Sequence, residues 1–132
     1  MSKKILLLGL IIAITIFITG CFSALPSSGL APVDEIDILI LESFPVQINV
    51  IARGNLPDPC TEISEVMKER EGDTFFITIK TYRYPGFCIQ ILAPFEEIIP
   101  LEVYGLPAGT YTVDVNGVQG TFDLEVDNII SN

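Results

Sequence analysis

Apolar and polar residues alternate along most of this chain after residue 34. In the clearest run, Tyr111, Val113 and Val115 fall on one face and Thr112 and Asp114 fall on the other. A period of two is the signature of a strand with one buried face. Three other runs of this kind each predict one buried face: Val46, Ile48, Val50 and Ala52 in the first; Phe75, Ile77 and Ile79 in the second; Val118, Phe122, Leu124 and Val126 in the third.

Turn signals separate these runs at intervals of about ten residues. Asn116-Gly117 is the strongest, because both residues tolerate positive φ and the pair favours a type I′ hairpin turn between the last two runs. The other turn signals lie at 43–45, 54–57, 71–73, 84–86, 93–94 and 105–109. Short strands at this spacing predict an all-β fold, an antiparallel β-sandwich of seven to eight strands in which each sheet hides one face.

One segment is compatible with two structures. In residues 61–70, Ile63, Val66 and Met67 recur at helical spacing, and Thr61 is a candidate N-cap. As a strand, the same segment forms a hairpin through the turn at 71–73. We favour the strand, because one short helix disagrees with the rhythm of the surrounding strands.

The first twenty residues follow a different pattern. Lys3 and Lys4 precede an uncharged run of fourteen residues from Ile5 to Ile18. This arrangement predicts a helical signal peptide over residues 1–20, and the run is short for a membrane span. The alternative is an uncleaved anchor. Both interpretations place the rest of the chain outside the cytoplasm.

Ile18-Thr19-Gly20-Cys21 resembles the lipobox of bacterial lipoproteins. The resemblance implies cleavage before Cys21 and attachment of a lipid with acyl chains such as palmitate to its sulfur. Two or more acyl chains anchor a protein stably, at about 0.8 kcal/mol per buried CH₂ group, so the domain needs no membrane affinity of its own. A free or disulfide-forming Cys21 is the alternative.

The remainder of the chain divides into three parts. Residues 21–33 are rich in Ser, Gly and Pro and predict a flexible tether, with an ordered first strand as the alternative. Residues 34–127 form the predicted β-sandwich domain, and residues 128–132 form a short tail.

Cys60 and Cys88 are the two cysteines that remain when Cys21 is assigned to lipid. An exported domain lies in an oxidising compartment, where a disulfide persists, and two cysteines allow one connectivity. We therefore predict a disulfide between them. A metal site and a catalytic thiol are weaker alternatives, because the chain has no histidine and no CxxC pair.

Charge and missing residue types exclude several functions. The residues after position 20 carry all seventeen acidic and five of the seven basic side chains, a net charge of −12. Such a domain repels phosphates, which argues against nucleic acid as a partner and against electrostatic adhesion to a membrane. Without histidine or a Gly-rich phosphate loop, the chain lacks Ser–His and Cys–His nucleophiles. We expect no enzyme activity, no catalytic or metal-binding residues and no cofactor.

Two acidic stretches, 34–37 and 127–128, lack the spaced calcium-binding pattern. We expect solvated strand edges that block aggregation, and a weak calcium-dependent module is the distant alternative.

The segment before Cys88 is the candidate binding loop. Tyr82, Arg83, Tyr84 and Phe87 surround a turn that the disulfide would pin. Aromatic residues with an arginine are typical of binding hot spots. The structural alternative is that Tyr82 and Phe87 cap the core while Arg83 pairs with an acidic neighbour.

The stretch 105–122, GLPAGTYTVDVNGVQGTF, together with NLPDPC upstream, resembles exported bacterial lipoproteins that end in an immunoglobulin-like β-sandwich. The resemblance implies a fold and an extracytoplasmic address at the cell membrane, not an activity. We expect a lipid-anchored, non-enzymatic binding or structural module of the cell envelope, with a protein or glycan partner. A small protease inhibitor that presents the loop 84–87 is the alternative.

Overall fold

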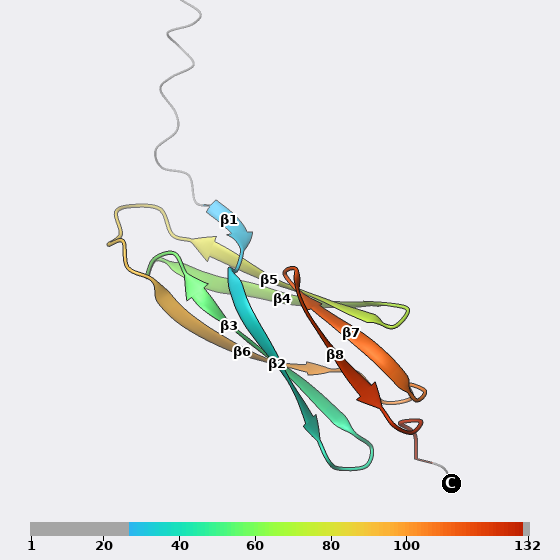
Figure 1. Cartoon of the computed structure of the whole chain (residues 1–132). Helices are drawn as coiled ribbons and strands as arrows, with labels where there is room; N and C mark the ends of the chain where they lie inside the picture. The colour runs from blue at the N-terminus through green and yellow to red at the C-terminus, as the bar shows by residue number, and fades with distance from the viewer. Residues whose placement is uncertain (1–26, 131–132) are drawn as a thin grey trace, which may run out of the picture.

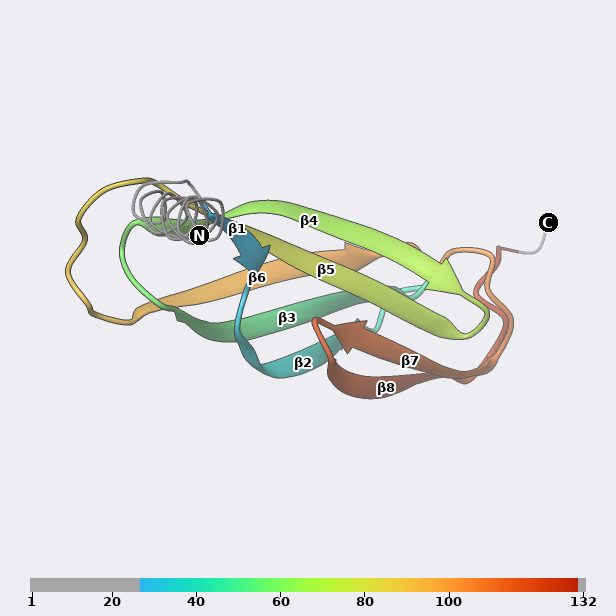
Figure 2. The same cartoon turned by 90° about the horizontal axis from the view of Figure 1, so that it is seen from above.

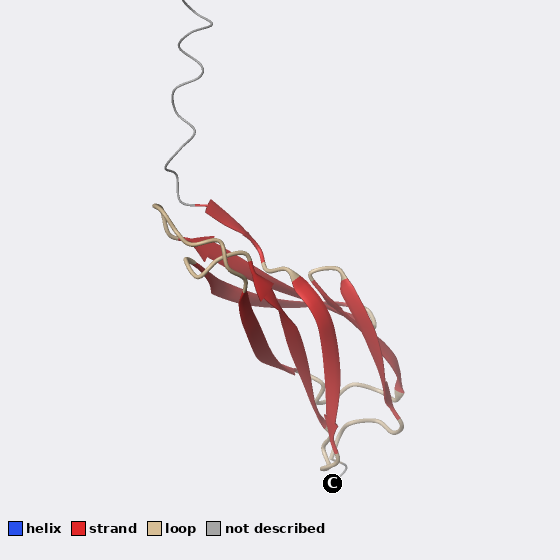
Figure 3. Cartoon of the chain, turned by 60° about the vertical axis from the view of Figure 1, so that its left-hand side comes forward, coloured by secondary structure: helices blue, strands red, loops and turns tan. Residues whose placement is uncertain are grey.

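The computed structural model describes residues 27–130, and these residues form eight strands and no helix (Figures 1 and 3). This confirms the predicted all-β fold. The strands are β1 (Ser27–Leu30), β2 (Val33–Leu41), β3 (Gln47–Leu56), β4 (Thr61–Glu71), β5 (Thr74–Arg83), β6 (Ala93–Leu101), β7 (Gly109–Val115) and β8 (Val118–Leu124).

The strands form two sheets that pack face to face, as the view from above in Figure 2 shows. One sheet has the order β2-β3-β6 and is antiparallel throughout. In the other, β4 pairs with one edge of β5, and β1 and β7 share the opposite edge, β1 along residues 80–83 and β7 along 74–77. The β5–β7 pairing is parallel, which departs from the predicted antiparallel arrangement.

The core lies between the sheets and uses the faces that the alternation predicts. Ile48, Val50 and Ala52 of β3 pack in the same buried cluster as Ile77 and Ile79 of β5. The prediction is wrong for Val126, which is exposed because β8 ends two residues earlier. Alternation therefore assigned the buried face correctly wherever a strand is paired.

The predicted hairpin turns are present. Asn116 and Gly117 both have positive φ, 48° and 93°, as a type I′ turn requires. Residues 61–71 form strand β4, which confirms the strand interpretation, and β4 turns into β5 through Gly72 at φ 59°. Tyr111 of β7 donates a hydrogen bond from its hydroxyl to the carbonyl of Pro107 at 2.7 Å, the contact that defines a tyrosine corner in sandwich folds.

Asn116 also joins elements that are distant in sequence. Its side-chain oxygen accepts a hydrogen bond from the Ile79 amide, and its side-chain nitrogen donates to the carbonyls of Ala31 and Ile79. The turn residue thus connects the β7–β8 hairpin to β5 and to the link between β1 and β2.

The boundaries of the domain differ from the predicted ones at both ends. Ser27–Leu30 form strand β1 on β5, so this stretch is not part of a flexible tether. Asn128 is 1% exposed and hydrogen-bonded to the fold, so it belongs to the sandwich and not to a tail. The predicted signal peptide over 1–20 and the predicted lipid site at Cys21 lie outside the described residues. Within residues 27–130, no helix is long and apolar enough to cross a membrane.

Candidate functional site

The loop between β5 and β6, residues 84–92, forms one tip of the sandwich (Figures 1 and 2). It displays apolar side chains to solvent: Phe87 is 96% exposed, Ile89 62%, Ile91 57% and Leu92 64%. An exposed apolar cluster of this kind marks an interaction surface in a soluble domain. We call residues 84–92 the apolar tip.

A disulfide holds the apolar tip against the neighbouring β3–β4 loop. Cys60 and Cys88 are bonded, with their Cα atoms 6.2 Å apart, and Cys88 is buried. The Tyr84 amide also donates a hydrogen bond to the Cys60 carbonyl at 3.0 Å. The predicted pairing is therefore present, and it closes the base of the tip.

A partly buried ion pair provides a second restraint. The Arg83 Nε lies 3.0 Å from Oδ2 of Asp58, whose side chain is buried. The two terminal nitrogens of Arg83 donate to the carbonyls of Tyr84 and Gly86 at 3.2 and 3.4 Å. One guanidinium thus links the β3–β4 loop to two backbone carbonyls of the tip.

Asp58 organises the other side of this link. Its Oδ1 accepts hydrogen bonds from the Cys60 amide and the Thr61 hydroxyl. Burial by itself would raise the pKa of Asp58, but the hydrogen bonds from Arg83 and Thr61 outweigh it and hold the pKa below its ordinary value. The carboxylate therefore stays ionised at neutral pH and keeps its bond to Arg83.

Asp58, Cys60 and Cys88 are also close enough together to suggest a metal site. The two sulfurs are bonded to each other, and both oxygens of the Asp58 carboxylate accept hydrogen bonds. This cluster is a structural brace for the tip.

Of the four residues of the predicted binding loop, Tyr82, Arg83 and Tyr84 contact other residues of the domain, and Phe87 is exposed. Tyr82 lies edge-on against Tyr84 at 5.1 Å, and the Tyr84 hydroxyl donates to Glu62 at 2.6 Å, which raises the pKa of Tyr84. Arg83 pairs with the acidic neighbour Asp58, as the structural alternative proposed. Phe87 does not cap the core, because almost all of its side chain is exposed.

Ile89, Ile91 and Leu92 were missed as surface residues. Ile89 and Ile91 flank Gln90 and so resemble one buried face of a strand, but no strand pairs with this loop in the described residues. One signal could have revealed them: residues 84–95 contain no charged side chain in a domain that is otherwise strongly acidic.

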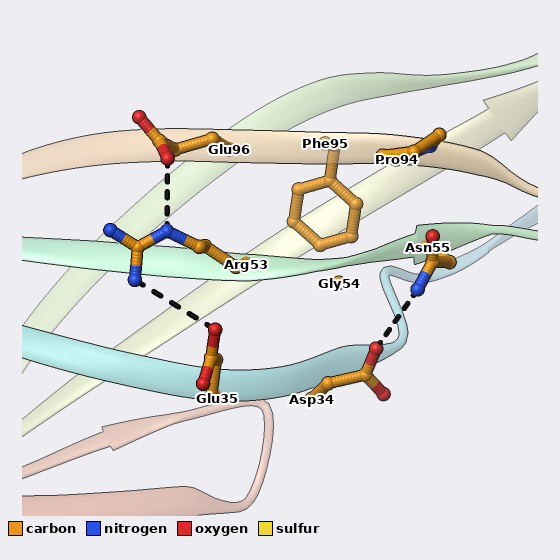
Figure 4. Close-up of a pocket in the computed structure, with 8 residues that line it drawn as sticks. All are labelled: Asp34, Glu35, Arg53, Gly54, Asn55, Pro94, Phe95 and Glu96. Carbon is orange, nitrogen blue, oxygen red and sulfur yellow. Dashed lines mark hydrogen bonds and ion pairs between the residues drawn. The ribbon is translucent and has the colours of Figure 1, made fainter.

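A second candidate site lies on the open face of the β2-β3-β6 sheet, in a pocket of about 400 Å³ (Figure 4). Arg53 is at its centre and pairs with Glu96 at 2.9 Å, with Glu35 at 3.8 Å and with Asp37. Hydrogen bonds to Asp37 and Glu96 raise the pKa of Arg53. These carboxylates are more than half exposed, so solvent screens the pairs and they contribute little to stability.

The acidic stretches considered for calcium are already engaged with protein groups. Asp34 accepts a hydrogen bond from Asn55 at 3.2 Å, and a cation near Glu35 and Asp37 would compete with Arg53 (Figure 4). At the other stretch, the buried Asn128 side chain bonds to backbone groups of the fold.

Comparisons with known proteins agree with the fold. The family model of the ORF11 beta-sandwich domain matches residues 50–124, a segment that contains the whole apolar tip and its braces. The chain is 36% identical over 93 residues to an uncharacterised 10.2 kDa protein in the HgiCIIM 5′ region of Herpetosiphon aurantiacus, covering 70% of this chain and 98% of the relative.

A second relative, the uncharacterised 10.2 kDa protein in the HgiBIM 5′ region of the same organism, is 36% identical over 83 residues, covering 62% of this chain and all of the relative. No solved structure matches. These relatives are spanned almost end to end by part of this chain, and the family match lies within the sandwich. The chain belongs to the ORF11 β-sandwich domain family.

Proposed function

We propose that this chain is a lipid-anchored protein of the cell envelope whose β-sandwich is a non-enzymatic binding module. Its anchor is lipid on Cys21, and its contact surface is the apolar tip. The observation that carries the proposal is the tip itself, because a disulfide and a partly buried ion pair restrain a loop that exposes several large apolar side chains to solvent. Apolar exposure on a restrained loop favours binding of a partner.

The anchor follows from the sequence and agrees with the disulfide. The uncharged run 5–18 ends in a lipobox-like Ile18-Thr19-Gly20-Cys21. A disulfide persists in the oxidising compartments that exported proteins enter, which supports the extracytoplasmic side of the membrane.

The chemistry of the described residues favours binding over catalysis. The three groups with shifted pKa values, Arg53, Asp58 and Tyr84, all owe the shift to hydrogen bonds with neighbouring side chains. Each of them therefore already has a structural partner. With no histidine in the chain, the usual base for a serine or cysteine nucleophile is also missing.

The first test is the intact mass of the protein extracted from membranes, measured with and without reductant and thiol alkylation. We expect a chain that begins at Cys21 and carries acyl chains, with two alkylated thiols that appear only after reduction. The Cys21→Ala variant, as the matched control, should carry no acyl mass. A full-length wild-type chain without acyl mass would refute the lipid anchor.

A protease inhibitor is the second candidate, and the exposure of Phe87 on a restrained loop favours it. The extracted protein should then inhibit a member of a panel of extracellular proteases, and Phe87→Ala should remove the inhibition. Unchanged protease activity across the panel would exclude this candidate.

A further inference from the structure

The apolar tip differs in charge from the rest of the domain. Residues 84–95 contain no Asp, Glu, Lys or Arg, whereas the residues after position 20 carry a net charge of −12. Two carboxylates next to its base are engaged, Asp58 with Arg83 and Glu62 with the hydroxyl of Tyr84. The tip is thus an uncharged apolar surface on an acidic protein.

The chain enters the sandwich at this same tip. Ser27, the first described residue, is paired with Arg83, the residue directly before the loop. Six residues separate Ser27 from Cys21, and an extended chain of that length reaches at most about 20 Å. Figure 1 shows β1 beginning next to the loop, while β8 ends at the opposite end of the sandwich. A lipid on Cys21 would therefore keep the tip close to the bilayer surface.

We propose that the apolar tip inserts into the lipid bilayer to which the chain is anchored. Phe87, Ile89, Ile91 and Leu92 enter the boundary between headgroups and acyl chains, where interfacial apolar elements bury to a depth of about 5–10 Å. This inference rests on the proposed function, because the anchor supplies the proximity, and it names the bilayer as the partner of the tip.

Some backbone groups of the tip are already hydrogen-bonded within the domain. Inside a bilayer, every unpaired amide or carbonyl carries a large cost, so each such bond lowers the cost of insertion. Arg83 already binds the carbonyls of Tyr84 and Gly86, and the Ile91 amide donates to the carbonyl of Ile89 at 3.1 Å. The Tyr84 amide is bonded to Cys60.

Insertion would also orient the domain. The β2–β3 turn, the β6–β7 connection and the end of β8 would then point away from the membrane, because they lie at the end of the sandwich opposite the tip (Figure 1). Tyr104, in the β6–β7 connection, is 63% exposed and follows the end of β6. It lies roughly 25 Å from the tip along that strand, at 3.3 Å per residue.

The absence of tryptophan from the sequence allows a direct test. Phe87→Trp places one fluorophore on the tip, and Tyr104→Trp places one on an exposed aromatic position at the far end as the matched control. Each full-chain variant is extracted and reconstituted into phosphatidylcholine vesicles whose acyl chains carry bromine as a quencher. We expect insertion to shift the emission of the fluorophore at position 87 to shorter wavelength and bromolipid to quench that emission. The emission of the fluorophore at position 104 should stay unchanged.

Equal quenching at both positions, or quenching at neither, would overturn the inference; the second result would return the tip to a protein or glycan partner. A further variant, Phe87→Trp with Ile89→Asp and Ile91→Asp, should lose the quenching while its melting temperature stays that of Phe87→Trp. Intact mass is measured on the same samples. A chain without acyl mass that still shows quenching at position 87 refutes the lipid anchor and supports insertion of the tip. An acylated chain without quenching supports the lipid anchor and refutes insertion of the tip.

Discussion

Asn128 provides the sharpest test of how the sandwich is held together at the end opposite the tip. Its side-chain oxygen accepts a hydrogen bond from the Val46 amide at 2.7 Å. Its side-chain nitrogen donates to the carbonyls of Val46 and Val103, each at 3.0 Å. The side chain is buried, so solvent can replace these three bonds only in part. We therefore predict that Asn128→Ala destabilises the domain strongly.

The magnitude follows from the three bonds. Each typical hydrogen bond contributes about 1 kcal/mol net, so the variant should lose about 3 kcal/mol of unfolding free energy. Two effects work in opposite directions around this value. Val46 is only half-buried, so water can partly replace its bonds, which makes the loss of stability smaller. Val103 is buried and its carbonyl keeps only a 3.3 Å bond from the Leu106 amide, which makes the loss larger. For a domain of this size, about 3 kcal/mol lowers Tm by roughly 10–15 °C.

The assay is urea unfolding of the detergent-solubilised protein, followed by far-ultraviolet circular dichroism. Asp127→Ala is the matched control, because Asp127 is exposed and accepts a single hydrogen bond, from the Ala108 amide at 2.8 Å. We expect that control to lose no more than about 1 kcal/mol. An Asn128→Ala variant that unfolds with the same midpoint as Asp127→Ala would show that the amide is not a brace.

Asn128→Asp gives the same site a pH dependence. The carboxylate still accepts the bond from Val46, but it faces the two carbonyls that the amide nitrogen bound. This environment disfavours the charged form, so the pKa of the introduced group is raised in the folded protein above the ordinary value of about 3.9. The destabilisation is then full above the folded pKa and is relieved as pH falls through it. Urea midpoints that fall on acidification faster than those of the wild type would contradict this.

Three further predictions concern the tip braces and the sheet. The Cys60–Cys88 disulfide spans 28 residues, so the variant Cys60→Ser with Cys88→Ser should lose roughly 3.5 kcal/mol of unfolding free energy. Urea unfolding should show a lowered midpoint, and reductant should no longer change that midpoint. The pKa of Asp58 is held low, so its contribution is full above its ordinary pKa of about 3.8 and is lost as pH falls through the folded value. Asp58→Asn should therefore unfold at neutral pH more readily than the wild type and lose less stability below pH 4, as urea midpoints at both pH values would show. A Cβ on Gly54 would meet the Pro32 carbonyl, so Gly54→Ala should lose about 1–3 kcal/mol in urea unfolding, whereas Gly29→Ala, with its nearest atom at 3.6 Å, should lose less.

The fold was predictable from the sequence because its main signals are local. Whether a strand residue faces the core or the solvent depends on a period of two, which Val50 and Val113 obey within their own strands. The hairpin at Asn116-Gly117 depends on two residues that accept positive φ. The parallel pairing of β5 with β7 was not predictable in this way, because it joins residues that neither turn chemistry nor alternation connects.

The candidate site was only partly predictable, because its determining contacts are distant in sequence. The position of the tip could be found from its uncharged aromatic stretch and from Cys88. Pairing of Arg83 with an acidic neighbour was an alternative, but the sequence could not identify the partner Asp58, because it lies 25 residues away. Asn128 was assigned to a tail for the same reason: the backbone groups of Val46 that it binds are 82 residues away.

The restraints on the tip keep the apolar side chain of Phe87 exposed to solvent. A free loop carrying Phe87, Ile89 and Leu92 would lower its free energy by folding these side chains onto the nearest apolar surface, because burial of each one is favourable by roughly 1.5–3 kcal/mol. The disulfide and the Asp58–Arg83 pair fix both ends of the first half of the loop, so this collapse is blocked for Phe87. Exposure of the tip is thus maintained against the hydrophobic effect, and a partner that covers it recovers that free energy.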